Sequence, residues 1–235
     1  MSDKKLEGAG LRGQVAGKTS LSTVGKAGKG LTYRGYPIEV LSEKAKFEEV
    51  AYLLMYGSLP NKDEYENYSS KLISMRSLPN PILEVLERIP ASAHPMDVMR
   101  TGCSMLGNIE PEGEFSNQQE SADRILATMA SIIVYWYKYS HEGKKVNTSS
   151  DYETIGGHFL SLLHGDEPSE DHIRCLDTSL ILYAEHGFNA STFTARTCAS
   201  TLSDIHSCIT GAIGTLRGPL HGGANEAAMD LIEQF

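Results

Sequence analysis

Apolar residues recur at helical spacing through most of the chain, which predicts a succession of helices, because positions three and four apart share one helix face. Stop and capping residues separate them: Gly57 and Pro60 end one helix, and Asn61 with Glu64 forms a capping box for the next. We therefore expect an all-α fold. The predicted helices cover approximately residues 47–54, 61–75, 80–89, a stretch from 95, then 121–142, 152–164, 169–185, 190–215 and 221–235.

Two short β-tolerant runs precede the helices. Ser20–Val24 and Leu31–Tyr36 flank a Gly-rich stretch at residues 25–30, a pattern that predicts a small hairpin. Residues 1–17 are polar and Gly-rich, and we expect them to form a flexible arm. After the arm we expect a large helical domain over residues 18–220, which is incomplete, and then a helix from residue 221 that leads into a smaller domain.

Composition narrows the choice of partners and compartment. The net charge of -9 leaves no general excess of cations for a nucleic-acid backbone. The four cysteines lack zinc-type spacing, and no signal-peptide pattern stands at the N-terminus, so we expect reduced thiols in the cytoplasm. The longest charge-free apolar stretch, Ile125–Tyr137, is too short to cross a bilayer, and we expect no membrane span.

The segment from Ala190 to Thr215 consists mostly of Ala, Ser, Thr, Gly and Cys. A helix with such small side chains lets a neighbouring helix approach closely. The segment therefore predicts either a subunit interface or a central helix buried within one subunit, and the sequence leaves both open.

The histidines give no metal-binding pattern. His158 and His164 are six positions apart, and no HExxH is present, so we predict no metal site. His94 directly precedes Pro95 at a helix start, where a structural, hydrogen-bonded role is expected.

Two other segments place histidine beside glycine at breaks between helices, where a ligand can approach the backbone. The first, residues 184–192, contains His186 and Asn189. The second, residues 217–226, contains His221 at the expected first turn of a helix. A helix start favours the neutral form of an imidazole, which can then donate a hydrogen bond to a carbonyl or an enolate. Local chemistry alone leaves His221 open to a catalytic role or a capping role.

These segments, together with others in the same order along the chain, resemble the citrate synthase family from about Leu11 to the last residue. Two segments resemble the 2-methylcitrate synthases within it, Ile133–His141 and Phe188–Arg196. The motifs that carry the family resemblance are Val24-Gly25-Lys26, Tyr33-Arg34-Gly35-Tyr36, Phe47-Glu48-Glu49-Val50-Ala51, His94 to Arg100, His186 to Thr192 and Gly218 to Asn225.

The resemblance implies a multi-helical large domain, a homodimer, and an acyltransferase that uses no cofactor beyond the coenzyme A thioester, its substrate. The implied reaction joins propionyl-CoA or acetyl-CoA to oxaloacetate and releases CoA. With propionyl-CoA the product is 2-methylcitrate, in propionate catabolism. With acetyl-CoA it is citrate, in the tricarboxylic acid cycle. A third hypothesis is a non-catalytic helical interaction module, which the small-residue segment and the lack of an identifiable base would suit.

By position in these motifs, His221 resembles the residue that stabilises the enol, and His186 the residue that polarises the oxaloacetate carbonyl. Asn189 is implied to orient oxaloacetate, and Arg76 to reach a CoA phosphate. The family pattern continues with a Gly-His-Pro segment, a catalytic Asp and carboxylate-binding arginines, which these residues do not include. We therefore expect a piece of a longer enzyme, inactive by itself.

Overall fold

The computed structural model describes residues 17–24, 30–223, 229 and 231–233. In this part the chain forms ten α-helices, one 3-10 turn and a two-stranded antiparallel sheet, which confirms the all-α prediction with its short hairpin. The strands are β1 (Thr32–Tyr33) and β2 (Tyr36–Pro37). The helices are α1 (Ile38–Lys44), α2 (Phe47–Tyr56), α3 (Lys62–Ser74), α4 (Asn80–Leu86), α5 (Pro95–Ile109), α6 (Gln118–Glu142), α7 (Ile155–His164), α8 (Glu170–Tyr183), α9 (Ala190–Ala199) and α10 (Ile205–Leu216), with the 3-10 turn η1 (Phe115–Asn117) before α6.

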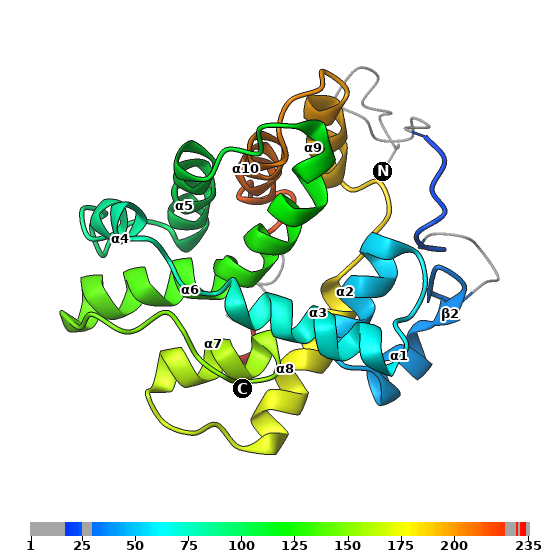
Figure 1. Cartoon of the computed structure of the whole chain (residues 1–235), viewed down its shortest axis with the longest axis horizontal. Coiled ribbons are helices and arrows are strands. Elements are labelled where there is room, and N and C mark those ends of the chain that lie inside the picture. The colour runs from blue at the N-terminus through cyan, green and yellow to red at the C-terminus, as the bar shows by residue number, and fades with distance from the viewer. Residues whose placement is uncertain (1–16, 25–29, 224–228, 230, 234–235) are drawn as a thin grey trace, which may run out of the picture.

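Helix α6 runs through the middle of the fold, with α5 and α10 on one side and α7 on the other (Figure 1). Its apolar residues cover most of its circumference, as a helix buried by neighbours requires. Gly102 of α5 faces Ile132 of α6, where an added Cβ would lie 2.5 Å from Ile132 Cγ2. The absence of a side chain at Gly102 therefore sets the close packing of α5 on α6.

Several predicted helix ends are confirmed because their signals are local. Asn61 Oδ1 accepts from Glu64 N and the Glu64 carboxylate accepts from Asn61 N, completing the capping box. Ser169 Oγ caps α8 by accepting from His172 N at 3.2 Å. Helix α6 begins three positions before the predicted Ser121, because η1 leads directly into it.

The sheet differs from the predicted hairpin. Its two strands join through Arg34 and Gly35, which have φ of 45° and 93° and form a two-residue turn. The run Ser20–Val24 contributes one isolated bridge, Ser22 to Tyr33, instead of a full strand. A tight turn thus lies at Arg34-Gly35, and residues 25–29 of the Gly-rich stretch lie outside the described residues.

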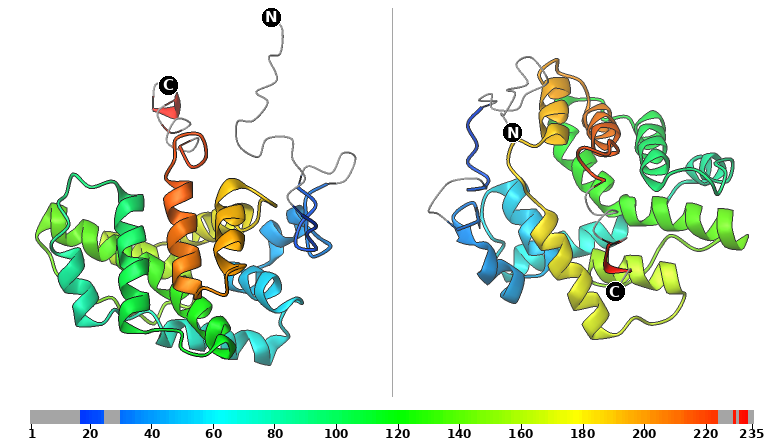
Figure 2. Two further views of the ribbon diagram at one scale, coloured as in Figure 1. Left: turned by 90° about the horizontal axis from the view of Figure 1, so that it is seen from above. Right: turned by 180° about the vertical axis from the view of Figure 1, so that it is seen from behind.

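The small-residue segment is two helices and not one. α9 ends at Ala199, and Asp204 starts α10 by accepting from Ser207 N at 2.9 Å. Between them, Leu202 has a positive φ of 62°, a conformation that no helix interior contains. The helices lie side by side (Figure 2), with α10 packed on α5 and α6 while α9 has no buried residue. Hence only α10 resembles the buried central helix considered above.

The remaining predictions fall largely outside the described residues. Of the arm at 1–17, only Gly17 is described, and the domain boundaries at 17 and 220 stay predictions. Residues 221–223 form a turn where a helix start was expected, whereas Met229, Leu231 and Ile232 are helical.

Candidate active site

A cavity of about 820 Å³ lies where the C-terminal end of α8, the N-terminal end of α9 and the turn after α10 meet the start of α5. His186, Asn189 and His221 all line it. The fold thus brings together, from two separate segments, the three residues for which the family resemblance implied catalytic or oxaloacetate-binding roles.

Asn189 starts α9 as its capping residue. Its Oδ1 accepts from Thr192 N at 2.9 Å and lies 2.8 Å from Ser191 Oγ. The carboxamide oxygen is therefore committed to the helix, and Nδ2 is the group that can face a ligand. A substitution at Asn189 would remove a helix cap as well as a contact in the cavity.

The backbone at His221 is a turn directed back onto α10. His221 N donates to Gly218 O at 2.9 Å, and Gly222 N donates to Leu216 O at 3.0 Å. The expectation that His221 occupies the first turn of its own helix is therefore corrected. The helix start beside this imidazole is that of α9, because Ser191 N donates to His221 Nε2 at 3.3 Å.

This contact also orders the imidazole of His221. Ser191 Oγ lies 2.9 Å from the same Nε2, so the ring is held by the backbone and the side chain of one residue. An Nε2 that accepts a hydrogen bond has no proton, so the neutral ring carries its proton on Nδ1. Nδ1–H is then the donor that His221 can direct at a ligand oxygen.

His186 lies on an exposed loop that is fixed on both sides. Before it, the hydroxyl of Tyr33 donates to Ile181 O at 3.1 Å, at the end of α8. Beside it, the Glu185 carboxylate accepts from Gly187 N at 2.5 Å and from Ser22 Oγ at 3.2 Å. No pattern in the sequence indicates these supports, although Tyr33 stands within the Tyr33-Arg34-Gly35-Tyr36 motif.

The charged and capping groups of the cavity come from three elements. Among the described residues that line it, Arg217 is the one permanent cation, and its Nε lies 3.5 Å from Asp97 Oδ2. Glu185 is the one carboxylate in that set. His94 also borders the cavity, and its Nδ1 accepts from Met96 N at 3.1 Å, which confirms its predicted structural role at the start of α5.

Arg76 lies away from this cavity and is fully buried. Its guanidinium donates to the backbone carbonyls of Ser150, Tyr152 and Glu153. A phosphate cannot reach a guanidinium enclosed in this way, so the position does not fit the predicted CoA contact. Arg76 instead holds the segment before α7 against the end of α3.

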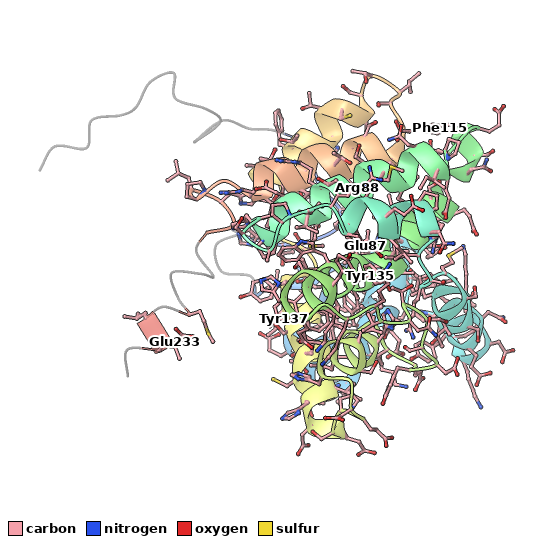
Figure 3. The ribbon with its side chains drawn as sticks, turned by 90° about the vertical axis from the view of Figure 1, so that its left-hand side faces the viewer. Glu87, Arg88, Phe115, Tyr135, Tyr137 and Glu233 are labelled. Carbon is pink, nitrogen blue, oxygen red and sulfur yellow. The ribbon has the colours of Figure 1, made fainter. Side chains whose placement is uncertain are left out.

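Of the two segments that resemble 2-methylcitrate synthases, Ile133–His141 lies outside the cavity, whereas Phe188–Arg196 contributes Asn189, Ser191 and Thr192 to its lining. Tyr135 is buried in α6, and its hydroxyl donates to Glu87 Oε1 at 2.7 Å (Figure 3). Trp136 Nε1 donates to Ile89 O at 3.3 Å, whereas Tyr137 is exposed. These side chains fasten α6 to α4 and the segment after it, and they are not placed to select the acyl group.

In the described part of the chain, no group of three or more His, Cys, Asp or Glu residues is arranged to hold a metal ion. No helix within the same residues is both long enough and apolar enough to span a membrane.

Comparison with known proteins assigns the family. Residues 10–235 match the family described as citrate synthase, C-terminal domain. The chain belongs to the citrate synthase family. This match covers α1 to α10 and every residue that lines the cavity.

Within the citrate synthase family, the chain is 67% identical over 236 residues to a 2-methylcitrate synthase of Shewanella oneidensis, covering 100% of this chain and 63% of that protein. The crystal structure of the citrate synthase from Thermotoga maritima matches with a TM-score of 0.82 and 36% identity, over 96% of this chain and 60% of that one.

A further solved structure is the ternary complex of carboxymethyl coenzyme A and oxaloacetate with the citrate synthase of Thermoplasma acidophilum. It matches with a TM-score of 0.83 and 26% identity, over 93% of this chain and 58% of that one. The chain thus spans about three-fifths of the length of these relatives, 58% to 63%.

Proposed function

We propose that the protein containing this chain condenses an acyl-CoA with oxaloacetate and releases CoA. The observation that carries the proposal is the shared cavity of His186, Asn189 and His221, in a chain 67% identical to a 2-methylcitrate synthase. The solved citrate synthase with carboxymethyl coenzyme A and oxaloacetate supports this pair of substrate classes.

In the proposed reaction, a base removes the α-proton of the thioester, and negative charge develops on the thioester oxygen. His221 Nδ1–H donates to that oxygen, and the enolate carbon attacks the ketone carbon of oxaloacetate. A preorganised donor at such an oxygen lowers the barrier by about 2.7–4 kcal/mol. Hydrolysis of the resulting thioester then releases CoA.

His186 and Asn189 act on oxaloacetate in this proposal. A hydrogen bond from His186 to the ketone oxygen draws electrons from the carbonyl carbon and favours attack. Asn189 Nδ2 orients the same substrate, since Oδ1 accepts from the backbone N–H of Thr192.

The base is proposed to come from outside the described cavity. Glu185 is the carboxylate that lines it, but its Oε1 already accepts from Ser22 and Gly187. We accordingly propose that the 235-residue chain alone is inactive. An assay of that chain with both substrates tests this directly, and measurable turnover would contradict it.

We propose propionyl-CoA as the preferred acyl donor, from the 67% identity to a 2-methylcitrate synthase. Acetyl-CoA is the second candidate, favoured by the likeness to the Thermotoga maritima citrate synthase. One methylene shifts selectivity by about 1–3 kcal/mol, so kcat/KM of the intact protein for the two thioesters, measured by free CoA release, separates the candidates. A strong preference for acetyl-CoA would decide for citrate synthesis, and no turnover of either would favour the non-catalytic helical module.

We also propose a cytoplasmic homodimer with α9 at or near its interface. The sequence expectation of reduced thiols supports the cytoplasmic part of this proposal. Helix α9 presents Ala199 on an exposed surface, and Ala212 lies on the neighbouring α10. Sedimentation of the intact protein beside its A199L/A212L variant tests the proposal, because added leucines should weaken the dimer. A monomer under all conditions would refute it.

A further inference from the structure

Two of the four cysteines face each other on the hairpin formed by α9 and α10. Cys198 is half-buried near the end of α9, and Cys208 is buried near the start of α10. The Cys208 thiol donates to Ser203 O at 3.8 Å, in the connection between the two helices. The other two cysteines stand apart: Cys175 is exposed on α8, and Cys103 is buried on α5 with its thiol directed at His206 O.

The packing of the two helices fixes this arrangement. Thr215 Oγ1 donates to Thr194 Oγ1 at 2.9 Å, and a Cβ on Gly211 would lie 3.5 Å from Thr194 Cγ2. The helices are thus antiparallel and in close contact on the side of the hairpin nearer the cavity. The cysteine pair lies on the same interface, one turn or so closer to the connecting residues 200–204.

We propose that Cys198 and Cys208 form a reversible disulfide, with a small-molecule disulfide such as oxidised glutathione as the oxidant. A disulfide requires two side chains that already approach each other, because the bond tolerates little distortion of the backbone. Cys198 lies one turn after Thr194, and Cys208 lies one turn before Gly211, so both are on the helix faces that these contacts bring together. Two thiols on facing sides of tightly packed helices meet that requirement. The bond would join the two helices near residues 200–204. The cavity lies at the other end of the hairpin, beside the start of α9 and the end of α10, so the bond would not enter it.

The exchange balances without any further reagent. The Cys198 thiolate attacks the disulfide of oxidised glutathione, which gives a mixed disulfide on Cys198 and releases one glutathione thiol. The Cys208 thiolate then attacks Cys198 Sγ and releases the second. The two protein thiols lose two electrons and two protons in total, and oxidised glutathione becomes two reduced molecules.

The order of the two steps follows from exposure. Cys198 is the more accessible thiol, so it meets the oxidant first. Burial raises the pKa of Cys208 to about 11, which keeps it protonated and makes the second step the slower one. We therefore expect the disulfide to accumulate over a long incubation at mildly alkaline pH, with the mixed disulfide on Cys198 as the intermediate.

The sequence makes this bond easy to detect. Trypsin cuts after Arg196 and Arg217, which leaves both cysteines in one peptide, residues 197–217. The folded protein is incubated with oxidised glutathione, alkylated under denaturing conditions and digested. The expected product is the 197–217 peptide without alkyl groups and lighter by two hydrogens than its reduced form. Dithiothreitol should restore two alkylation sites.

Variants supply the controls. C175S removes the exposed thiol and should leave the cross-link unchanged. In C198S, Cys208 should remain a free thiol after the same incubation. The disulfide should also raise the Tm of the wild-type chain in a manner reversed by dithiothreitol, and C198S should show no such rise.

Two outcomes would overturn the proposal. One is a 197–217 peptide that is still alkylated at both cysteines when Cys175 has already reacted with oxidised glutathione. The other is stable glutathione on Cys198 with Cys208 still free. Since C198S changes a half-buried residue, the comparison does not depend on whether a variant at the buried Cys208 folds.

Discussion

Ser191 Oγ lies 2.9 Å from His221 Nε2, and the backbone N–H of Ser191 donates to the same nitrogen at 3.3 Å. The backbone N–H and the hydroxyl of one residue on α9 thus hold the Nε2 edge of an imidazole that comes from the turn after α10. The second ring nitrogen, Nδ1, is left for the substrate. In the proposed reaction Ser191 is therefore a positioning residue that acts through His221.

Replacing Ser191 by alanine should remove the side-chain half of this contact and leave the backbone half. We expect kcat to fall by about fivefold, since one such hydrogen bond contributes about 1 kcal/mol. Oxaloacetate affinity should change little. S191T keeps the hydroxyl and should restore kcat. Steady-state kinetics of the intact protein measure both parameters, and equal losses in the two variants would show that the hydroxyl is not what matters.

His221→Ala and His186→Ala should separate the two proposed roles. In the intact protein, H221A should lower kcat by about 10²–10³, because it removes the donor at the developing oxyanion, and should leave oxaloacetate binding largely unchanged. H186A should weaken oxaloacetate binding as well as turnover. Titration calorimetry with oxaloacetate distinguishes them, and an equal loss of binding in both variants would contradict this division.

Glu48 should make the stability of the fold fall as the pH rises. Burial raises the pKa of Glu48 to about 7, partly offset by the hydrogen bond that Ile155 N donates at 2.6 Å, while nearby Asp177 raises it further. A raised pKa means that the folded state favours the protonated acid. The resulting stabilisation is present below the ordinary pKa near 4.5 and is lost as the pH passes 7.

Glu48→Gln should flatten this dependence, because the amide cannot ionise and its oxygen can still accept from Ile155 N. Urea unfolding at pH 5 and pH 8 should show a wild-type loss larger than that of E48Q by up to about 3 kcal/mol. E43Q changes the same charge on an exposed residue of α1 and should keep the wild-type profile. Parallel profiles for wild type and E48Q would mean that Glu48 does not control the effect.

Gly102→Ala should loosen the packing of α5 on α6. The added Cβ would lie 2.5 Å from Ile132 Cγ2 within a buried contact, so a shift of the helices or of Ile132 is required. Such overpacking costs about 1–3 kcal/mol. I132A creates a cavity at the same place, and G102A/I132A should be less destabilised than the sum of the single variants. Denaturant unfolding measures all three, and strict additivity would contradict a direct clash.

The parts of this fold that the sequence predicts are those with local signals. Ser169 caps α8 through a residue three positions away, and Gly143 ends α6 in the left-handed conformation that glycine adopts readily. The true hairpin turn was missed because one of its positive-φ residues is Arg34, a type seldom found there. The break at Leu202 was missed for the same reason.

In the candidate site, too, residues within local motifs were predicted and contacts between distant segments were not. His186, Asn189 and His221 were identified from their motifs, and the structure gathers them in one cavity. The contact of Ser191 with His221 joins residues 30 positions apart and depends on how α9 meets the turn after α10. No periodicity in the sequence encodes such a contact. Arg76 failed as a CoA contact because its burial is likewise a property of packing.

Tyr33 has a consequence for how the site assembles. Its hydroxyl reaches Ile181 O across 148 positions of the chain, and the loop that carries His186 begins just beyond that contact. Contacts between such distant residues form only after a long loop has been closed, so they slow folding relative to neighbouring pairs. The hairpin emerges from the ribosome well before α8, so the contact of Tyr33 with Ile181 cannot form until α8 has been synthesised. We therefore expect the His186 loop to reach its final position late, once the hairpin and the far end of α8 have met.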